Sequence, residues 1–151
     1  MWDRLRKQVE TERELLNRLV ETHRPLLSKS TSETPDAIEL SALAAMLHSF
    51  YTGILNMLKR VAVEVDGKVP SGVMWHRDLL EALVDPNESR PRVISDELYR
   101  TLREYLAFRH VFRSAYAFDL RWDKMRKLVL ECEATLRRVE DEVDRFLTSA
   151  S

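Results

Sequence analysis

The stretch LAAMLHSFYTGILNMLKRVAVEV, residues 43–65, carries the apolar repeat that decides the fold. Its large apolar residues recur every three or four positions: Leu43, Leu47, Phe50, Ile54, Leu58, Val61 and Val65. This spacing places them along one side of an α-helix, which has about 3.6 residues per turn. We predict a helix over residues 35–65, with Thr34 as its N-cap, Pro35 at its first position and Asp66-Gly67 at its end.

The same periodicity predicts four further helices. We expect long helices over about residues 3–27, 95–117 and 122–147, and a short helix over residues 73–84. Ser95 is expected to be the N-cap of the fourth helix. Only three glycines and five prolines interrupt the 151 residues, which favours long helices over a turn-rich β fold. The predicted fold class is all-α: one domain over residues 1–151, a bundle of four long helices plus one short helix.

The composition limits the classes of partner. Hydrophobic residues make up 44% of the chain and charged residues 32%, as in a folded domain with a well-solvated surface. The net charge is −1, so any contact with RNA must come from a local basic cluster. The first residues, MWDRLRKQVETERELL, are amphipathic and highly charged, which is typical of neither a signal peptide nor a membrane span. We therefore expect no membrane contact.

The cysteine and histidine residues indicate neither disulfides nor metal binding. The single cysteine, Cys132, cannot form an internal disulfide and sits in a helical apolar pattern, which predicts a small core residue in a cytoplasmic protein. The four histidines show no ligand spacing such as HExxH, and there is no GxGxxG or phosphate loop. We expect no metal and no cofactor. His48 is expected in the core or at its boundary, and His76 either anchors the short helix or lies at the rim of a site.

The segment LREYLAFRHVFRSAYAFDLRW, residues 102–122, stands out chemically. Seven Lys or Arg and three Asp or Glu lie between Arg100 and Arg126, whereas the remainder of the chain is net acidic. Arg103 and His110 are seven residues apart and share a helix face, and Arg113 follows His110 by one turn. On the same helix Arg109 and Tyr116 are also expected to share a face.

Two hypotheses fit this cluster. Guanidinium groups bind phosphate, and an imidazole can transfer a proton near neutral pH, so together they suit RNA cleavage without a metal. Alternatively the arginines pair with acids on neighbouring helices, such as Glu64, Asp66 and Glu81, and the chain is a purely structural bundle.

The run FRHVFRSAYAFDLRW, residues 108–122, resembles the FRHxxR-x-x-Y signature of HepT-like proteins. Residues 47–80, LHSFYTGILNMLKRVAVEVDGKVPSGVMWHRDLL, resemble the second helix and following loop of that family. The resemblance implies a HEPN-like helical bundle, a two-fold homodimer and a nucleotidyltransferase-type antitoxin encoded nearby. It also implies metal-independent RNA cleavage at a site along the dimer interface.

The motif can be placed on this chain in two registers. HEPN sites use an Arg, four to six residues, and then a His, and many HepT toxins add one residue and a Tyr. In one register Arg103 pairs with His110. In the other, Arg109 is the Arg, Tyr116 is the Tyr, and Ser114 takes the position of the His. Serine cannot act as a general acid or base near neutral pH.

Each register predicts a different function. The first predicts a toxin-type ribonuclease in which His110 transfers the proton, Arg103 and Arg113 bind the phosphate, and Arg109 and Tyr116 shape the site. The second, marked by Ser114, predicts a catalytically degenerate module that binds RNA, a nucleotidyltransferase partner or the nucleotide substrate of that partner.

Overall fold

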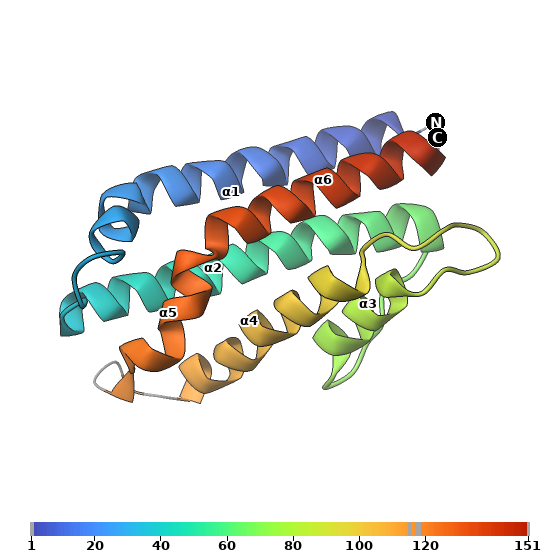
Figure 1. The fold of residues 1–151 in the computed structure, drawn as a ribbon. Helices are drawn as coiled ribbons and strands as arrows, with labels where there is room; N and C mark the ends of the chain where they lie inside the picture. The colour runs from blue at the N-terminus through green and yellow to red at the C-terminus, as the bar shows by residue number, and fades with distance from the viewer. Residues whose placement is uncertain (1, 115, 117–118, 151) are drawn as a thin grey trace.

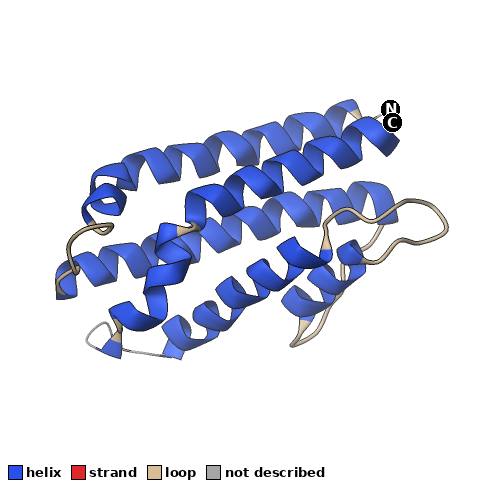
Figure 2. Ribbon diagram, viewed as in Figure 1, coloured by secondary structure: helices blue, strands red, loops and turns tan. Residues whose placement is uncertain are grey.

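A computed structural model describes residues 2–114, 116 and 119–150 of the chain. Within these residues the structure contains helices and loops but no strand (Figure 2). The elements are α1 (Asp3–Lys29), α2 (Ala37–Val61), a π-helical turn (Ala62–Asp66), α3 (Trp75–Val84), α4 (Asp96–Ser114), α5 (Trp122–Leu130) and α6 (Cys132–Ala150). The predicted all-α class is confirmed. Figure 1 shows α1, α2, α4 and α6 running alongside one another, with both chain termini at one end.

The central element is α2, which contacts each of the other described helices. Six of the seven apolar positions predicted for its buried face are at most 1% exposed: Leu43, Leu47, Phe50, Ile54, Leu58 and Val61. Val65, in the π-helical turn, is partly buried against the same core. The span Ala37–Asp66 is long and apolar enough to cross a membrane by length and composition alone. Its apolar side chains instead form the middle of the bundle.

The start of α2 differs from the prediction. Its N-cap is Asp36, not Thr34, and its first residue is Ala37. The Asp36 carboxylate accepts a hydrogen bond from Glu39 N at 2.9 Å, and the Glu39 carboxylate accepts one from Asp36 N at 3.0 Å. This capping box satisfies two backbone donors at once, whereas a cap at Thr34 would satisfy fewer. The prediction of the cap was therefore wrong by two residues.

The predicted last helix is two helices, because the chain leaves helical geometry at Glu131, where φ is −100° and ψ is 1°. The break is one residue wide. The apolar stripe continues across it without a change of spacing, and all its members are buried: Met125, Val129, Cys132, Leu136, Val139, Val143 and Leu147. The stripe was predictable from the sequence, but the break was not. Burial raises the pKa of the Cys132 thiol to about 11, as suits a core residue.

The first turn of α4 is fixed by a side chain from α6. Ser95 Oγ accepts a hydrogen bond from Leu98 N at 3.1 Å, which confirms Ser95 as the cap. Glu142 accepts hydrogen bonds from Ser95 N at 2.6 Å and from Ser95 Oγ at 2.9 Å. The start of the helix that carries the predicted site is therefore tied to the neighbouring helix.

The loop before α4 is held by a buried ion pair. The Arg90 side chain is 2% exposed and donates to the two Asp66 carboxylate oxygens at 2.8 and 2.9 Å. It also donates to the carbonyl oxygens of Ala82, Asp85 and Pro91. The hydrogen bonds from Arg90 hold the pKa of the Asp66 carboxyl below its ordinary value. One arginine thus joins the end of the π-helical turn, the end of α3 and the loop that leads into α4.

We predict that Asp66→Ala lowers the free energy of unfolding by roughly 3–5 kcal/mol, because it leaves the buried Arg90 charge without its carboxylate. Urea unfolding measures the loss. Arg4→Ala is the control: Arg4 is 76% exposed and pairs with Glu64 at 2.6 Å, so its removal should cost under about 1 kcal/mol. Equal losses in the two variants would contradict this account.

The same pair predicts an acid dependence. Because the folded-state pKa of Asp66 is depressed, its contribution to stability is present above the ordinary value of 3.8 and is lost as the pH falls below it. The difference in stability between the wild type and Asp66→Ala should therefore shrink in acid.

Candidate functional site

The buried stripe of α4 turns two predicted site residues outward. Leu98, Leu102 and Tyr105 on this helix are at most 2% exposed and face the core. Arg103 and His110 lie together beside this buried stripe, about 100° around the helix from Leu102, and both are exposed. The structure therefore brings Arg103 and His110 to one solvent-facing side of the same helix, as their spacing predicts.

Arg103 is held by an aromatic neighbour one turn earlier. Its Nη1 donates to Tyr99 Oη at 2.9 Å, and its guanidinium carbon lies 5.7 Å from the centroid of the Tyr99 ring. The Tyr99 hydroxyl in turn donates to Glu81 on α3 at 3.3 Å. Within the described part of the chain Arg103 forms no ion pair, so its contact with an acid runs through a neutral hydroxyl.

Arg109 lies on a different side of α4 and reaches α3. Its Nη1 donates to His76 Nδ1 at 3.1 Å. Because a guanidinium can only donate, Nδ1 must be the acceptor, and the neutral imidazole carries its proton on Nε2. The Trp75 ring packs against His76 with centroids 3.8 Å apart and the rings nearly perpendicular. His76 is the site residue that the sequence left undecided, since nothing in a pattern links two positions 33 residues apart.

A cavity of about 190 Å³ opens where the start of α3 meets α4. Its lining combines apolar and basic side chains: Val73, Met74, Trp75, His76, Arg77, Leu106, Arg109 and His110. This cavity is the place where the predicted Arg109 and His110 come together with α3.

The three acids expected as partners of the arginine cluster pair elsewhere. Glu64 binds Arg4 at 2.6 Å, and Asp66 binds Arg90 at 2.8 Å. Glu81 lies 3.6 Å from Arg77 on its own helix. Within the described residues these three acids therefore form their ion pairs with Arg4, Arg90 and Arg77, none of which lies on α4.

The other predicted site residues lie at or beyond the end of α4. The backbone of Arg113 and Ser114 belongs to the last turn of the helix, but their side chains lie outside the described residues. Tyr116 follows the end of the helix and is 71% exposed. The described helix ends at Ser114, and the predicted end at about residue 117 lies outside the described residues. Because Tyr116 is not helical, the helix face that Arg109 and Tyr116 were expected to share is not formed.

Tyr51 on α2 places a buried hydroxyl under the cluster. The side chain is 1% exposed, and its hydroxyl has no hydrogen-bond partner among the described residues. Burial raises the pKa of this hydroxyl, and the smaller effects of the Arg109 and Arg103 charges lower it. Tyr51 therefore keeps its proton at neutral pH and lies within the electrostatic influence of both arginines.

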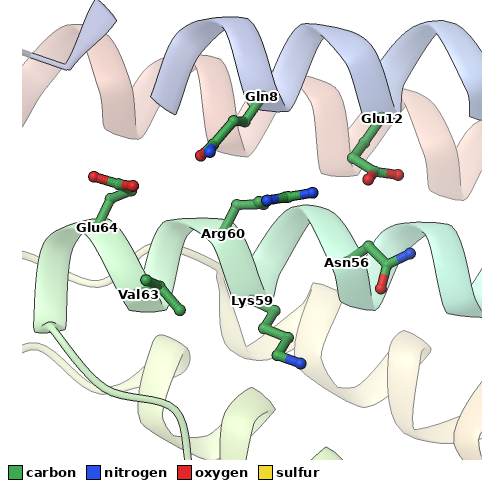
Figure 3. Close-up of a pocket in the computed structure, with 7 residues that line it drawn as sticks. All are labelled: Gln8, Glu12, Asn56, Lys59, Arg60, Val63 and Glu64. Carbon is green, nitrogen blue, oxygen red and sulfur yellow. The ribbon is translucent and has the colours of Figure 1, made fainter. Parts of the chain in front are cut away.

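Two further hollows lie apart from this cavity. One, of about 320 Å³, lies between α1 and α2, where Gln8 and Glu12 face Asn56, Arg60 and Glu64 (Figure 3). Its charges are of both signs, so it suits a phosphate less well than the α3–α4 cavity does. The other, of about 460 Å³, lies between α4 and α5 and is mainly apolar. Within the described residues no three His, Cys, Asp or Glu side chains group as a metal site requires.

Comparison with known proteins identifies the family to which the chain belongs. The family model of the HepT-like proteins matches residues 42–150, which include α4 and the whole arginine cluster. No curated protein and no solved structure matches the chain. The match covers well over half of the chain, so the protein belongs to the HepT-like family, a group of HEPN-type, toxin-like helical modules. The α1 helix lies before the matched residues, although Leu5, Val9, Leu16 and Val20 on it are part of the core.

We predict that Tyr51→Phe leaves the free energy of unfolding unchanged or raises it by up to about 1 kcal/mol, because a buried hydroxyl without a partner is destabilising. Tyr105→Phe is the matched control. Tyr105 is 2% exposed, and its hydroxyl donates to Leu128 O at 2.8 Å, so its removal should lower the stability by about 1 kcal/mol. A larger loss in Tyr51→Phe than in Tyr105→Phe, measured by urea unfolding, would show that the Tyr51 hydroxyl is satisfied.

Proposed function

We propose that this protein is the toxin-type component of a toxin–antitoxin pair and acts on RNA in the cytoplasm, cleaving it without a metal ion. The observation that supports this most is the exposed Arg103–His110 pair on α4, with Arg109 beside it. These residues lie inside the region that matches the HepT-like family. Their chemistry is that of phosphate binding and proton transfer.

The proposed reaction is an attack of the ribose on its own phosphate. His110 accepts the proton of the 2′-OH while O2′ forms a bond to phosphorus and the bond from phosphorus to O5′ breaks. The proton then passes to the leaving O5′, so the products are a 2′,3′-cyclic phosphate and a 5′-hydroxyl. Arg103 and Arg113 stabilise the negative charge that develops on the phosphate oxygens, as oriented cations do in such reactions.

A second candidate function rests on Ser114. In the register that places Arg109 and Tyr116 on the family motif, the position of the catalytic His is a serine. A serine hydroxyl cannot accept a proton near neutral pH. The protein would then bind RNA, a nucleotidyltransferase partner or the nucleotide substrate of that partner, without cleaving RNA.

We also propose a homodimer that buries the apolar groove beside α4, with a nucleotidyltransferase-type antitoxin as the further partner. The groove is lined by six apolar side chains: Ala107, Phe108, Val111, Leu120, Met125 and Leu128. Its rim has charges of both signs, since it includes Glu104, Asp119, Lys124 and Lys127. A surface with both signs can pair with itself across a two-fold axis. Val111, 59% exposed, neighbours His110, so a dimer formed here would bring two sites together.

The wild type is expected to cleave single-stranded RNA in the presence of EDTA, and His110→Ala to lose about a hundred-fold to ten-thousand-fold in rate. Gel analysis of the fragments and of their cyclic-phosphate ends measures this. His48→Ala is the control. The His48 ring packs against the Phe112 ring, with the two centroids 5.7 Å apart, and so lies away from the exposed side of α4. Cleavage that survives His110→Ala would remove His110 from the mechanism.

If Ser114 marks a degenerate site that binds RNA, wild type and His110→Ala will both be inactive but will still bind RNA. Ser114→His should then restore cleavage, because it places an imidazole at the position that the second register requires. A protein that neither cleaves nor binds RNA overturns the RNA-directed function and favours the nucleotidyltransferase partner, or its nucleotide, as the ligand.

The dimer is expected at micromolar concentration by light scattering. Val111→Glu should convert it to a monomer with unchanged helix content, because it places a charge in the apolar groove. Ile38→Glu, at a position that is 82% exposed on the start of α2, should leave the dimer intact. A monomeric wild type would refute the proposed assembly.

A further inference from the structure

The cavity between the start of α3 and α4 has the electrostatic character of an anion site. Arg77, Arg109 and His110 contribute to its walls, and none of the described residues that line it is acidic. Arg77 also forms ion pairs on its own helix, with Asp78 at 4.0 Å and Glu81 at 3.6 Å, so Arg109 is the cation on which the proposed anion site depends. The start of α3 lines the same cavity, and its N-cap Met74 supplies no side-chain acceptor to the first backbone N–H groups of the helix. With about 190 Å³ of space, the cavity has room for a phosphate group.

The contact between Arg109 and His76 orients a cation without neutralising it. A carboxylate in place of the imidazole would fix Arg109 equally well, but it would cancel the charge that an incoming anion needs. The neutral Nδ1 at 3.1 Å fixes one arm of the guanidinium and adds no negative charge. Trp75 packs on the ring of His76, so the imidazole itself is held in place.

We propose that this cavity binds a phosphate of the RNA strand through Arg109, and that His76 is the residue that positions Arg109 for it. The proposal rests on the RNA-directed function proposed above and extends the site from α4 to α3. In this arrangement one phosphate of the RNA lies on the side of α4 that faces α3, while Arg103 and His110 face the solvent. The RNA backbone would then pass over α4 near His110, which borders both places.

Because His76 accepts as a neutral group, a negatively charged acceptor at this position can distinguish a role in phosphate binding from a purely structural role. His76→Asp keeps an acceptor for Arg109 and converts the contact into an ion pair near a helix N-terminus, where a carboxylate is favoured. If His76 only holds α3 to α4, this variant should be as stable as the wild type and bind RNA as well. If His76 positions a phosphate ligand, stability should be kept while RNA affinity falls.

The experiment measures fluorescence anisotropy of a labelled single-stranded oligouridylate of about twelve nucleotides at several salt concentrations, with urea unfolding in parallel. Arg109→Ala should weaken binding about tenfold and reduce the salt slope by about one, as expected for the loss of one phosphate contact. His76→Asp should weaken binding at least as much without loss of stability. His76→Asn keeps a neutral acceptor near the position of Nδ1 and should stay within about threefold of the wild type. Ser71→Asp, in the exposed loop before α3, controls for an added charge outside the cavity and should have the smaller effect.

The possible outcomes distinguish a failure of RNA binding through Arg109 from a failure of the positioning role of His76. If the wild type binds no RNA, or Arg109→Ala binds as tightly as the wild type at every salt concentration, the RNA-directed use of this arginine fails and the positioning role fails with it. If Arg109→Ala weakens binding but His76→Asp behaves like Ser71→Asp, only the role of His76 is overturned. If His76→Asp does not fold, His76→Asn decides: a tenfold loss in this neutral variant contradicts the proposal, and retained affinity supports it.

Discussion

The packing of α4 against α2 fixes the direction of the charges that this protein can use. Leu98, Leu102 and Tyr105 are buried, so the helix cannot rotate about its axis without exposing them. A rotation by one residue, about 100°, would carry Arg103 toward the core, where an arginine without a partner is strongly unfavourable. The hydrophobic effect therefore sets the geometry of a polar site, since burying one stripe determines which side chains face outward.

Polar contacts then set the position of α4 along its axis. Glu142 holds the cap of α4, and the pair of Arg90 with Asp66 holds the loop that precedes it. The contact between Arg109 and His76 joins α4 to the start of α3 further along. Each contact bridges elements that are distant in sequence, so together they define a rigid frame around the α3–α4 cavity. A frame of this kind suits the binding of a phosphate, because the cations are already placed before the ligand arrives.

Features that depend on spacing within one helix were predictable from the sequence, and features that depend on docking were not. The core positions of α2 and the shared side of Arg103 and His110 follow from helical periodicity, and both are confirmed. The cap at Asp36 was missed because two candidate caps compete within three residues. The break at Glu131 leaves the apolar spacing unchanged and so gives no signal. The contact of Arg109 with His76 depends on how α3 docks on α4, which periodicity does not specify.

We propose that RNA binds this protein on α4 and the start of α3, whether or not Ser114 permits cleavage. The most direct measurement is a titration of ¹⁵N-labelled protein with a single-stranded oligoribonucleotide, followed by NMR through the backbone amide signals. We expect the chemical-shift changes to concentrate at residues 73–77 and 103–110, while the amide signals of residues that border the hollow between α1 and α2 do not move. Shifts centred on Gln8, Asn56 and Arg60, or no shifts at saturating RNA, would contradict it.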